Sequence, residues 1–523
     1  MGNRESEGRL PVLVAGAGPV GLMAACELAS AGVAVTVLEE RTEPDRVLKA
    51  GSVGPLAIEA LERLGLHDEL VTAEQATMAG YAQMAEELTA AGRPEEASAL
   101  DKAQREHFAG LEKIDASRRS DPGRRRMRVP QPVLVQILLR KAGQLGVRVL
   151  SGHAVEGLTQ DAEGVTVDVR TGEGAVRFEA AYLLGCDGRD SAVRSAAGFA
   201  FPGTAPTMLG RQGVVSLADP TQIPPGIHAV EGGVVVWGLG VDRVAALEFI
   251  EPPAGLGPLT LDELHAAVRR VSGIDLDIIE MKAGGRFTDE ARHVPEYRKG
   301  RVLLAGDAAH IHAPVGGQGL NYGLIDAVNV AWKLAARLHG WAGDELLDTY
   351  SAERHPQAEQ LLDNTRAQTA LMRPDSHSRA LRTLFERLLE LDDAHRFIGD
   401  MMAALDTRYE LGDEDPLVGT LCPDVKLAVP DDSADVAVRR LAELPHDGQG
   451  VLLTFDAGPL PVRVADGWTG RVRVVPAVAE RDEVRAMLLR PDGCVAWVLR
   501  PGADPTDDSL AAALCRWFGQ PAH

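Results

Sequence analysis

Short apolar runs that end at a glycine or an acidic residue are the clearest pattern in this chain. The first lies at residues 12–14 and leads into the turn 16–21 (GAGPVG). Residues 22–31 then have helical character, and residues 33–38 form a second apolar run that ends at Glu39. Continuous apolar runs bounded by turn residues are typical of strands that are buried on both faces. The pattern predicts a strand–turn–helix–strand unit, and hence an α/β fold with a parallel sheet.

The glycines of the first turn have the spacing of a dinucleotide-binding motif. Gly16 would permit the tight turn, Gly18 would let a pyrophosphate approach the backbone, and Gly21 would let helix and strand pack closely. The free N–H groups at the start of the helix favour phosphate binding. Glu39 follows Gly21 by 18 residues, where a carboxylate can hold the ribose hydroxyls. The segment therefore predicts a dinucleotide site, and it leaves NAD(P) and FAD open as the ligand.

Two later apolar runs end near an aspartate. Residues 182–194 (YLLGCDGRDSAVR) place Asp187 just after a strand, and a strand at 301–305 is followed by Asp307. Ligands of open α/β sheets gather at the carboxyl ends of strands, so both carboxylates are candidates for cofactor contacts. Asp187 also fits a helix N-cap or a turn. That interpretation is less favoured for Asp307, because the glycine-rich stretch 314–319 follows it.

Taken in order, these motifs resemble a known family, the FAD-dependent group A aromatic hydroxylases of the para-hydroxybenzoate hydroxylase fold. The resemblance rests on GAGPVGL, CDGRDSAVR and GDAAHIHAPVGGQGLNYGLIDAVNVAWKLA, and it spans nearly the whole chain. HFAGL (107–111), FPGT (201–204) and RPDGCVAW (490–497) are similar to the branch that oxygenates aromatic polyketides such as angucyclines and anthracyclines. The resemblance implies FAD as the cofactor, with NADPH or NADH as co-substrate.

The resemblance also implies roles for individual residues. Pro314 would lie beside the reactive edge of the flavin and is the candidate catalytic residue. Asp307 would hold the ribityl chain, and Asp187 would lie near the phosphates and the path of NAD(P)H. The helix that begins near Leu320 would direct its positive end at the pyrimidine side of the ring. The full set of implied FAD contacts is Gly16, Gly18, Gly21, Glu39, Lys49, Gln131, Asp187, Asp307, Gly316, Gly317, Gly319, Leu320 and Asn321.

Two positions depart from the family pattern. The family usually has arginine after the ribose-binding glutamate, whereas this chain has Glu40 and then Arg41. Lys49, in VLKAGS, stands where relatives commonly have an FAD-contacting arginine. Lysine keeps the charge but loses the two-pronged hydrogen bonding of a guanidinium.

The same resemblance divides the chain into four segments. Residues 1–204 and 285–400 are expected to form a discontinuous Rossmann-type FAD-binding domain, whose second part includes a long helix. Residues 205–284 contain strand-like stretches, GGVVVWGLG and RVAALEFIE, and are expected to form an inserted β-sheet substrate domain. Residues 410–523 are expected to form a thioredoxin-like C-terminal domain, with strands near VLLTF, VRVVP and VAWVL. Because this domain lacks CxxC, we expect it to have a structural role or to form the contact of a homodimer.

Composition narrows the function mainly by exclusion. The chain of 523 residues carries a formal charge of -22, which argues against nucleic-acid binding, since phosphate neutralisation needs a basic face. No apolar run is long enough for a transmembrane helix, and the N-terminus lacks the apolar core of a secretion signal, so no membrane contact is expected. The five cysteines are dispersed without CxxC spacing. They favour reduced thiols in the cytoplasm, without disulfides or a metal site.

Three weaker signals have structural interpretations. The basic stretch 118–128 (RRSDPGRRRMR) fits a solvated loop best, with nucleic acid or the 2′-phosphate of NADPH as alternative contacts. His310 and His312 invite a catalytic role, but packed, hydrogen-bonded histidines are favoured. Residues 73–106 are expected to be helical and polar.

The sequence and the resemblance together predict an FAD-dependent, NAD(P)H-consuming monooxygenase that hydroxylates a polycyclic aromatic polyketide with O₂, through a flavin C4a-hydroperoxide. One alternative is a Baeyer–Villiger oxygenase acting on a polyketide ketone. Another, of a different class, is a flavin-binding pathway protein without turnover, which only Lys49 favours. A plain NAD(P) dehydrogenase is disfavoured, because it would have no use for the motifs at Asp187 and Asp307.

Overall fold

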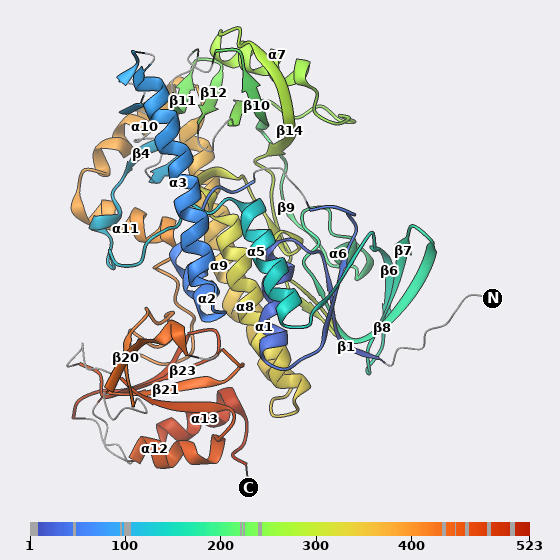
Figure 1. Ribbon diagram of the computed structural model, residues 1–523, viewed down its shortest axis with the longest axis vertical. Coiled ribbons are helices and arrows are strands. Elements are labelled where there is room, and N and C mark those ends of the chain that lie inside the picture. Colours follow the sequence, from blue (N-terminus) through green and yellow to red (C-terminus); the bar gives the residue numbers. More distant parts are fainter. Residues whose placement is uncertain are drawn as a thin grey trace.

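The molecule has a central α/β region, an antiparallel sheet at one end and a smaller α/β unit at the other (Figure 1). The computed structural model describes residues 9–44, 49–90, 92–94, 97–98, 106–219, 222, 225–238, 243–430, 436–444, 446–455, 460–477, 483–502 and 508–522. Among these residues, no helix has the length and apolarity needed to cross a membrane. The prediction of a mixed α/β fold is confirmed.

The central sheet contains eight strands: β1 (Leu10–Ala15), β2 (Val35–Glu39), β5 (Arg148–Ser151), β6 (Ala154–Gln160), β7 (Val165–Thr171), β8 (Gly174–Gly185), β16 (Arg298–Lys299) and β17 (Val302–Leu304). Their order is β16-β17-β8-β1-β2-β5, and β7 joins β6 to β8. β1 pairs in parallel with both β2 and β8, so Val12 lies between Val35 and Tyr182. The predicted strand–turn–helix–strand unit therefore lies in the middle of the sheet, where strands are buried on both faces.

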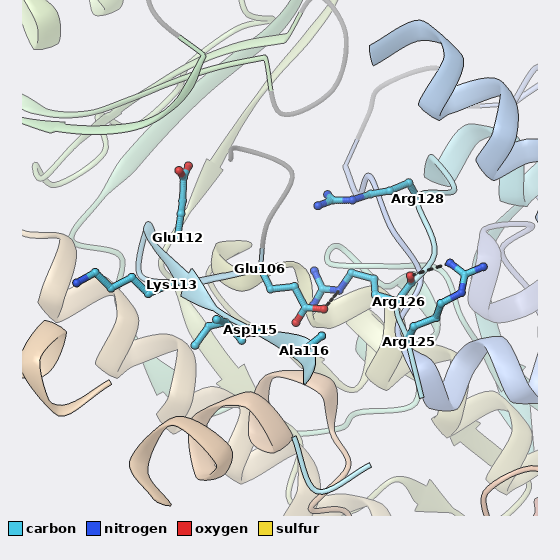
Figure 2. Close-up of a pocket in the computed structure, with 9 residues that line it drawn as sticks. Glu106, Glu112, Lys113, Asp115, Ala116, Arg125, Arg126 and Arg128 are labelled. Carbon is cyan, nitrogen blue, oxygen red and sulfur yellow. Dashed lines mark hydrogen bonds and ion pairs between the residues drawn. The ribbon is translucent and has the colours of Figure 1, made fainter. Parts of the chain in front are cut away.

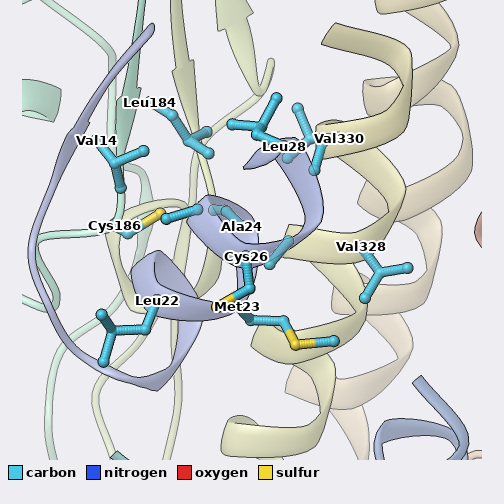
Figure 3. Close-up of a cluster of buried hydrophobic side chains, with 14 of the residues drawn as sticks. Val14, Leu22, Met23, Ala24, Cys26, Leu28, Leu184, Cys186, Val328 and Val330 are labelled. Carbon is cyan, nitrogen blue, oxygen red and sulfur yellow. The ribbon is translucent and has the colours of Figure 1, made fainter. Parts of the chain in front are cut away.

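Helices pack on both sides of this sheet: α1 (Pro19–Ser30), α2 (Pro55–Arg63), α3 (His67–Ala90), α5 (Gln131–Gln144), α6 (Ala192–Ala196), α8 (Gly319–Leu338) and α9 (Asp344–Met372). Helix α1 is enclosed between the sheet and α8, and Figure 3 shows Leu28 between Leu184 of β8 and Val330 of α8. Every residue of α1 from Gly21 to Leu28 is buried, and all of them except Glu27 are apolar or glycine, which suits this position. The packing fixes the N-terminus of α1 at the carboxyl end of β1.

A five-stranded antiparallel sheet covers the top of the central region: β10 (Leu209–Leu217), β11 (Gly226–Val230), β12 (Gly233–Trp237), β13 (Arg243–Glu248) and β14 (Ile278–Thr288). Side chains of β12 alternate between its two faces. Val235 and Trp237 pack against α7 (Leu261–Ser272), whereas Val234 and Val236 belong to the same apolar cluster as Ala313. The stretches GGVVVWGLG and RVAALEFIE thus contain the observed strands β12 and β13, and one face of the sheet is directed at the loop that contains Ala313.

Short elements fill the space beside this sheet: β3 (Glu106–Phe108), β4 (Leu111–Ile114), β9 (Gly203–Thr204), β15 (Ala291–His293), β18 (His310–Ile311), α10 (Ser376–Leu388) and α11 (Asp392–Ala403). The predicted helix 73–106 is observed as α3 as far as Ala90, and residues 99–105 lie outside the described part of the chain. The solvated loop predicted at 118–128 is wrong for Arg119, which is only 4% exposed because its guanidinium binds Glu106 inside the protein.

The C-terminal unit is a four-stranded sheet with two helices: β21 (Gly450–Thr454), β22 (Val472–Pro476), β23 (Ala486–Leu489), β24 (Val495–Leu499), α12 (Leu460–Ala465) and α13 (Ser509–Phe518). A hairpin of β19 (Lys426–Pro430) and β20 (Val436–Arg440) precedes it. β21 and β22 are parallel, whereas β23 and β24 are antiparallel neighbours. The three strands predicted here are observed as β21, β22 and β24. β23, whose sequence is AMLL, was not predicted.

A buried ionic cluster joins this unit to α8 and α9. The Glu353 carboxylate of α9 accepts two hydrogen bonds from Arg490, at 2.7 and 2.8 Å, and one from Lys333 of α8 at 2.9 Å. Asp492 accepts from Arg490 at 2.5 Å and from Asn329 at 3.1 Å. All five residues are less than 5% exposed. The charges balance as two cations and two anions, which is the condition under which buried ions are tolerated.

Candidate active site

The first glycine turn has the geometry that its sequence predicts. Gly16 has φ of 98°, and its N–H donates to the Leu38 carbonyl at 2.7 Å. A Cβ on Gly16 would collide with the Cys186 carbonyl, and one on Gly21 would collide with the Gly16 carbonyl. A Cβ on Gly18 would meet no atom within 4 Å. Gly16 and Gly21 are therefore required by packing, whereas Gly18 faces open space, as a turn that receives a pyrophosphate must.

Glu39 lies at the end of β2 directly beside this turn. Its Oε2 accepts from the Ala17 N–H at 2.7 Å, and its Oε1 accepts from the Arg41 N–H at 3.0 Å. These two bonds fix the carboxylate while each oxygen keeps capacity for a further donor. The arrangement suits a carboxylate that holds ribose hydroxyls next to a pyrophosphate turn.

A second group of candidates lies on the loop between β17 and α8. Asp307, Pro314 and Gly317 are exposed, although the residue on each side of each of them is buried. The Asp307 carboxylate makes no hydrogen bond or ion pair to any described residue. Gly317 has φ of 65°, and a Cβ there would meet no atom within 4 Å. These three positions are thus the exposed points of one loop, and the Asp307 carboxylate keeps its capacity to accept hydrogen bonds from a ligand.

The other two glycines of this loop have a different explanation. A Cβ on Gly316 would lie 2.7 Å from the Met402 methyl group, and one on Gly319 would lie 2.7 Å from Nε2 of His312. Protein packing alone therefore favours glycine at both positions. A backbone contact between either glycine and the flavin stays a prediction.

Asn321 holds the loop in place through its side chain. Its Oδ1 accepts from the Gly54 N–H at 2.6 Å, and its Nδ2 donates to the Gly317 carbonyl at 3.2 Å. The side chain thus connects the loop before α2 to the exposed turn at Gly317. Helix α8 begins at Gly319, one residue before the predicted start at Leu320, and its N-terminal end is directed at the same turn.

Lys49 and Gln131, two further candidates, lie close together although they belong to different segments. The Gln131 N–H donates to the Ala50 carbonyl at 2.8 Å, which places Lys49 close to the start of α5. Gln131 is half-buried, and Lys49 is exposed. Two residues that are 82 positions apart in the sequence therefore lie close together, and their contact with the flavin stays a prediction.

Asp187 has a clear structural role. Its Oδ1 accepts from the Ser191 hydroxyl at 2.6 Å, and its Oδ2 accepts from the Val193 N–H at 3.0 Å, so it closes the turn into α6. Burial raises the pKa of Asp187 above its ordinary value, and the two hydrogen bonds act against that rise. Its backbone lies beside Gly16 of the pyrophosphate turn. A direct role toward the phosphates or NAD(P)H stays a prediction.

The sequence interpretation missed a buried carboxylate that positions the Asp307 turn. Asp326 of α8 accepts from His310 at 2.8 Å, from Arg354 at 2.7 Å and from the Gly306 N–H at 3.1 Å. Although burial acts to raise it, Arg354 and His310 hold the pKa of Asp326 below its ordinary value. The prediction of a packed, hydrogen-bonded His310 is confirmed. A carboxylate within the apolar run LIDAV was the signal that could have revealed Asp326.

Replacing Asp307 with alanine is expected to weaken FAD binding about 10- to 150-fold, because a charged acceptor for the ribityl hydroxyls contributes roughly 1.5 to 3 kcal/mol. FAD fluorescence during titration of the apoprotein measures the dissociation constant. Asp363→Ala, an exposed aspartate on α9, is the control and should bind FAD normally. Equal dissociation constants for the Asp307 variant and the parent protein would remove Asp307 from the site.

Comparisons with known proteins agree with this geometry. Residues 9–365 match the family described as FAD binding domain, and residues 415–521 match the aromatic-ring hydroxylase C-terminal family. A 12-dehydrotetracycline 5-monooxygenase/anhydrotetracycline 6-monooxygenase of Streptomyces rimosus is 38% identical over 98% of this chain and 100% of its own length. The solved structure of OxyS anhydrotetracycline hydroxylase from Streptomyces rimosus has a TM-score of 0.85 at 36% identity and covers 98% of this chain and 100% of that one.

A third relative carries the name of a different reaction. A dialkyldecalin synthase of Streptomyces rugosporus is 35% identical over 98% of this chain and 99% of its own length. Matches of this length and identity nevertheless fix the family, and its named hydroxylases and monooxygenases fix the chemical class. The chain belongs to the FAD-dependent aromatic-ring hydroxylases and is an aromatic monooxygenase of that family.

Proposed function

We propose that the protein hydroxylates a polycyclic aromatic polyketide, with FAD as cofactor, NAD(P)H as reductant and O₂ as co-substrate. The observation that carries the proposal is the exposure of Asp307, Pro314 and Gly317 on one loop among buried neighbours. The names of the tetracycline-pathway relatives support a fused-ring polyketide as the substrate class.

Several segments would hold the cofactor. Gly18 and Glu39 would bind its ADP half, and Asp307 would bind the ribityl chain. The Gly317 backbone, held by Asn321, would lie against the ring, with the remaining predicted contacts at Lys49, Gln131, Asp187, Gly316, Gly319 and Leu320. When bound, FAD accepts a hydride from NAD(P)H and activates O₂, and the protein supplies orientation and a dry site.

The apolar face of the five-stranded sheet would form part of the substrate site. Ala313 and Val315, on either side of Pro314, share a cluster with Phe108 and with Val234 of the sheet. Such a lining excludes water from the reacting atoms and presents a flat surface to fused rings. The proposal therefore assigns the substrate domain to the sheet of 205–284, with Pro314 as the residue at the reacting edge.

The C-terminal segment 410–523 would be a thioredoxin-like unit without redox function. The parallel pair β21–β22, followed by antiparallel β23 and β24 and by α13, supports the first part of this proposal. Burial raises the pKa of the Cys494 thiol, which keeps it unreactive and supports the second. The absence of a disulfide at any of the five cysteines, all of which the structure describes, also supports a reducing compartment such as the cytoplasm.

With anhydrotetracycline and labelled O₂, we expect one labelled oxygen to appear as a new ring hydroxyl. Val315 and Gly316, which follow Pro314, carry no ionisable group that could act as a base for attack on a ketone. Burial lowers the pKa of nearby His312 to about 4. Its Nδ1–H donates a hydrogen bond to the Ala313 carbonyl at 2.7 Å. Mass spectrometry of the product locates the label.

Other outcomes separate the alternatives. Label inserted between a carbonyl carbon and its neighbour would identify a Baeyer–Villiger oxygenase. A changed carbon skeleton without label would indicate a reaction other than oxygenation, as the name dialkyldecalin synthase suggests for one relative. FAD-loaded protein that oxidises no NAD(P)H with any fused-ring substrate would support a flavin-binding protein without turnover. The assay should include other fused-ring compounds similar to anhydrotetracycline. The ring that is attacked depends on how the substrate site orients each compound.

A further inference from the structure

A cavity of about 510 Å³ opens beside the β3–β4 hairpin (Figure 2). The hairpin segment 106–116 forms one wall, and Arg125, Arg126 and Arg128 form the other. The cavity wall is linked to the segment before α2, because Val53 and Met127 exchange backbone hydrogen bonds of 2.9 and 3.0 Å. The next residue, Gly54, donates its N–H to Asn321 at 2.6 Å and so connects this segment to the loop between β17 and α8. A reactant that extends from the flavin could therefore reach the cavity.

Beside the cavity, one carboxylate, that of Glu106, lies near two guanidinium groups, those of Arg119 and Arg126. The Glu106 carboxylate accepts a hydrogen bond from Arg119 and lies 3.7 Å from Nε of Arg126. The Arg119 side chain is fully buried, and its Nε and Nη1 have no hydrogen-bond partner. Nε of Arg126 has none either. One carboxylate thus serves two guanidinium groups, and three of their nitrogens lack an acceptor.

Arg128 adds a third guanidinium to this group. Figure 2 shows its side chain extending over the space above the Glu106–Arg126 pair. Among the residues that the structure describes, none accepts a hydrogen bond from the Arg128 side chain. Burial and the charge of Arg126 lower the pKa of Arg128 below its ordinary value, against the opposing effect of Tyr81 and Glu106. A half-buried cation without an acceptor is costly unless a ligand provides one.

The other charged groups on the cavity wall already have partners. Arg125 forms an ion pair of 2.8 Å with Glu74, and Lys113 forms one of 3.1 Å with Glu386. The Asp115 carboxylate accepts from the Ser117 hydroxyl at 2.7 Å. Glu112 stands on the opposite wall from Arg128. The unmatched positive charge is therefore concentrated at Arg126 and Arg128.

We propose that this cavity binds an anionic oxygen group of a reactant, held by the guanidinium groups of Arg128 and Arg126. Two reactants of the proposed function have this chemistry: NADPH through its phosphates, and a fused-ring phenol through its ionised oxygens. Guanidinium groups suit both, because they donate paired hydrogen bonds to oxygen anions. The inference rests on the proposed function for the choice of these reactants, but the anion site itself does not depend on turnover.

The first test measures the anion site without catalysis. Inorganic pyrophosphate is the probe, and FAD-loaded enzyme is the sample. Thermal unfolding of the parent protein should shift upward with pyrophosphate, and Arg128→Gln should lose most of that shift. Arg125→Gln is the matched control from the same stretch and should keep it. Without pyrophosphate, Arg128→Gln should be at least as stable as the parent, because it removes a cation that lacks an acceptor.

The second test identifies the source of the anion. In anaerobic flavin reduction, a roughly 10-fold higher half-saturating concentration of NADPH in Arg128→Gln, with or without an effect on NADH, assigns the site to the coenzyme. Alizarin, a fused-ring phenol whose colour reports ionisation, probes the substrate source. Weaker binding of ionised alizarin with unchanged coenzyme kinetics assigns the site to the substrate.

The proposal fails if Arg128→Gln matches Arg125→Gln in the pyrophosphate shift, in coenzyme kinetics and in alizarin binding. A failure of the proposed function looks different. In that case the pyrophosphate shift would persist and depend on Arg128, while NAD(P)H would not reduce the flavin.

Discussion

Replacing Glu353 with alanine is expected to lower the free energy of unfolding by about 3 to 5 kcal/mol. The Glu353 carboxylate accepts hydrogen bonds from both Arg490 and Lys333 in a region closed to water. Its removal leaves two buried cations with Asp492 as their remaining anion. Chemical denaturation followed by circular dichroism measures the change. Because the cluster joins the C-terminal unit to α8 and α9, protease cleavage near residues 400–425 should also become faster.

The pH dependence of the free energy of unfolding gives a second measurement of the contribution of the Glu353 carboxylate to stability. Although burial acts to raise it, Arg490 and Lys333 hold the pKa of Glu353 below its ordinary value of 4.5. A carboxylate with a lowered folded-state pKa contributes its full stability above the ordinary value and loses it as the pH falls below that value. The stability gap between the parent and Glu353→Ala should therefore narrow below pH 4.5.

Glu359→Ala is the control, since Glu359 is an exposed glutamate on the same helix. It should change the free energy of unfolding by about 0.5 kcal/mol or less. If both variants lose the same small amount, the cluster does not hold the C-terminal unit in place.

Replacing Gly317 with valine is expected to abolish flavin seating while the protein stays folded. Gly317 has φ of 65°, and a side chain there would extend into space that contains no protein atom. The left-handed backbone costs valine roughly 1 to 2 kcal/mol, which a protein of this size tolerates. The same side chain would occupy the volume of the ring. Absorbance of bound flavin after gel filtration, together with the circular dichroism spectrum, measures both effects.

Gly146→Val separates backbone strain from the loss of the ring site. Gly146 has φ of 76° and also faces open space, but it lies at the turn after α5, far from Asp307 in the sequence. Both variants should lose similar stability, and only Gly317→Val should lose flavin. A Gly317 variant with full flavin content and normal turnover would show that the ring does not approach this backbone.

The sequence predicted the structure best where the fold and the candidate site depend on residues that are close together in the chain. The turn 16–21 and its following helix could be predicted because every requirement lies within one short segment. Glycines of similar motifs are nevertheless needed for different reasons. Gly18 faces open space, whereas Gly316 is packed against Met402. A single sequence cannot distinguish these cases, since the decisive neighbour of Gly316 lies 86 positions away.

The ionic contacts could not be predicted for the same reason. Arg490 lies 137 positions from Glu353, and no local pattern relates them. Arg354 follows Glu353 directly, yet it belongs to a different cluster, with Asp326. The interpretation of Asp187 as a turn former, which used neighbouring residues alone, was correct for its side chain. The resemblance had implied a cofactor role for the same residue. Long-range packing decides which charged residues are structural.

The proposed flavin site combines segments from residues 16–21, 49–54 and 307–321 with Gln131, and this has a consequence for how the protein is made. The strand β17 that positions the last segment pairs with β8 and follows the whole five-stranded sheet in the chain. At ordinary rates of translation, that segment leaves the ribosome roughly 15 to 60 seconds after the first glycine turn. Stable flavin binding at the proposed site therefore cannot begin with the first glycine turn, because it needs a segment that the ribosome releases only after residue 321.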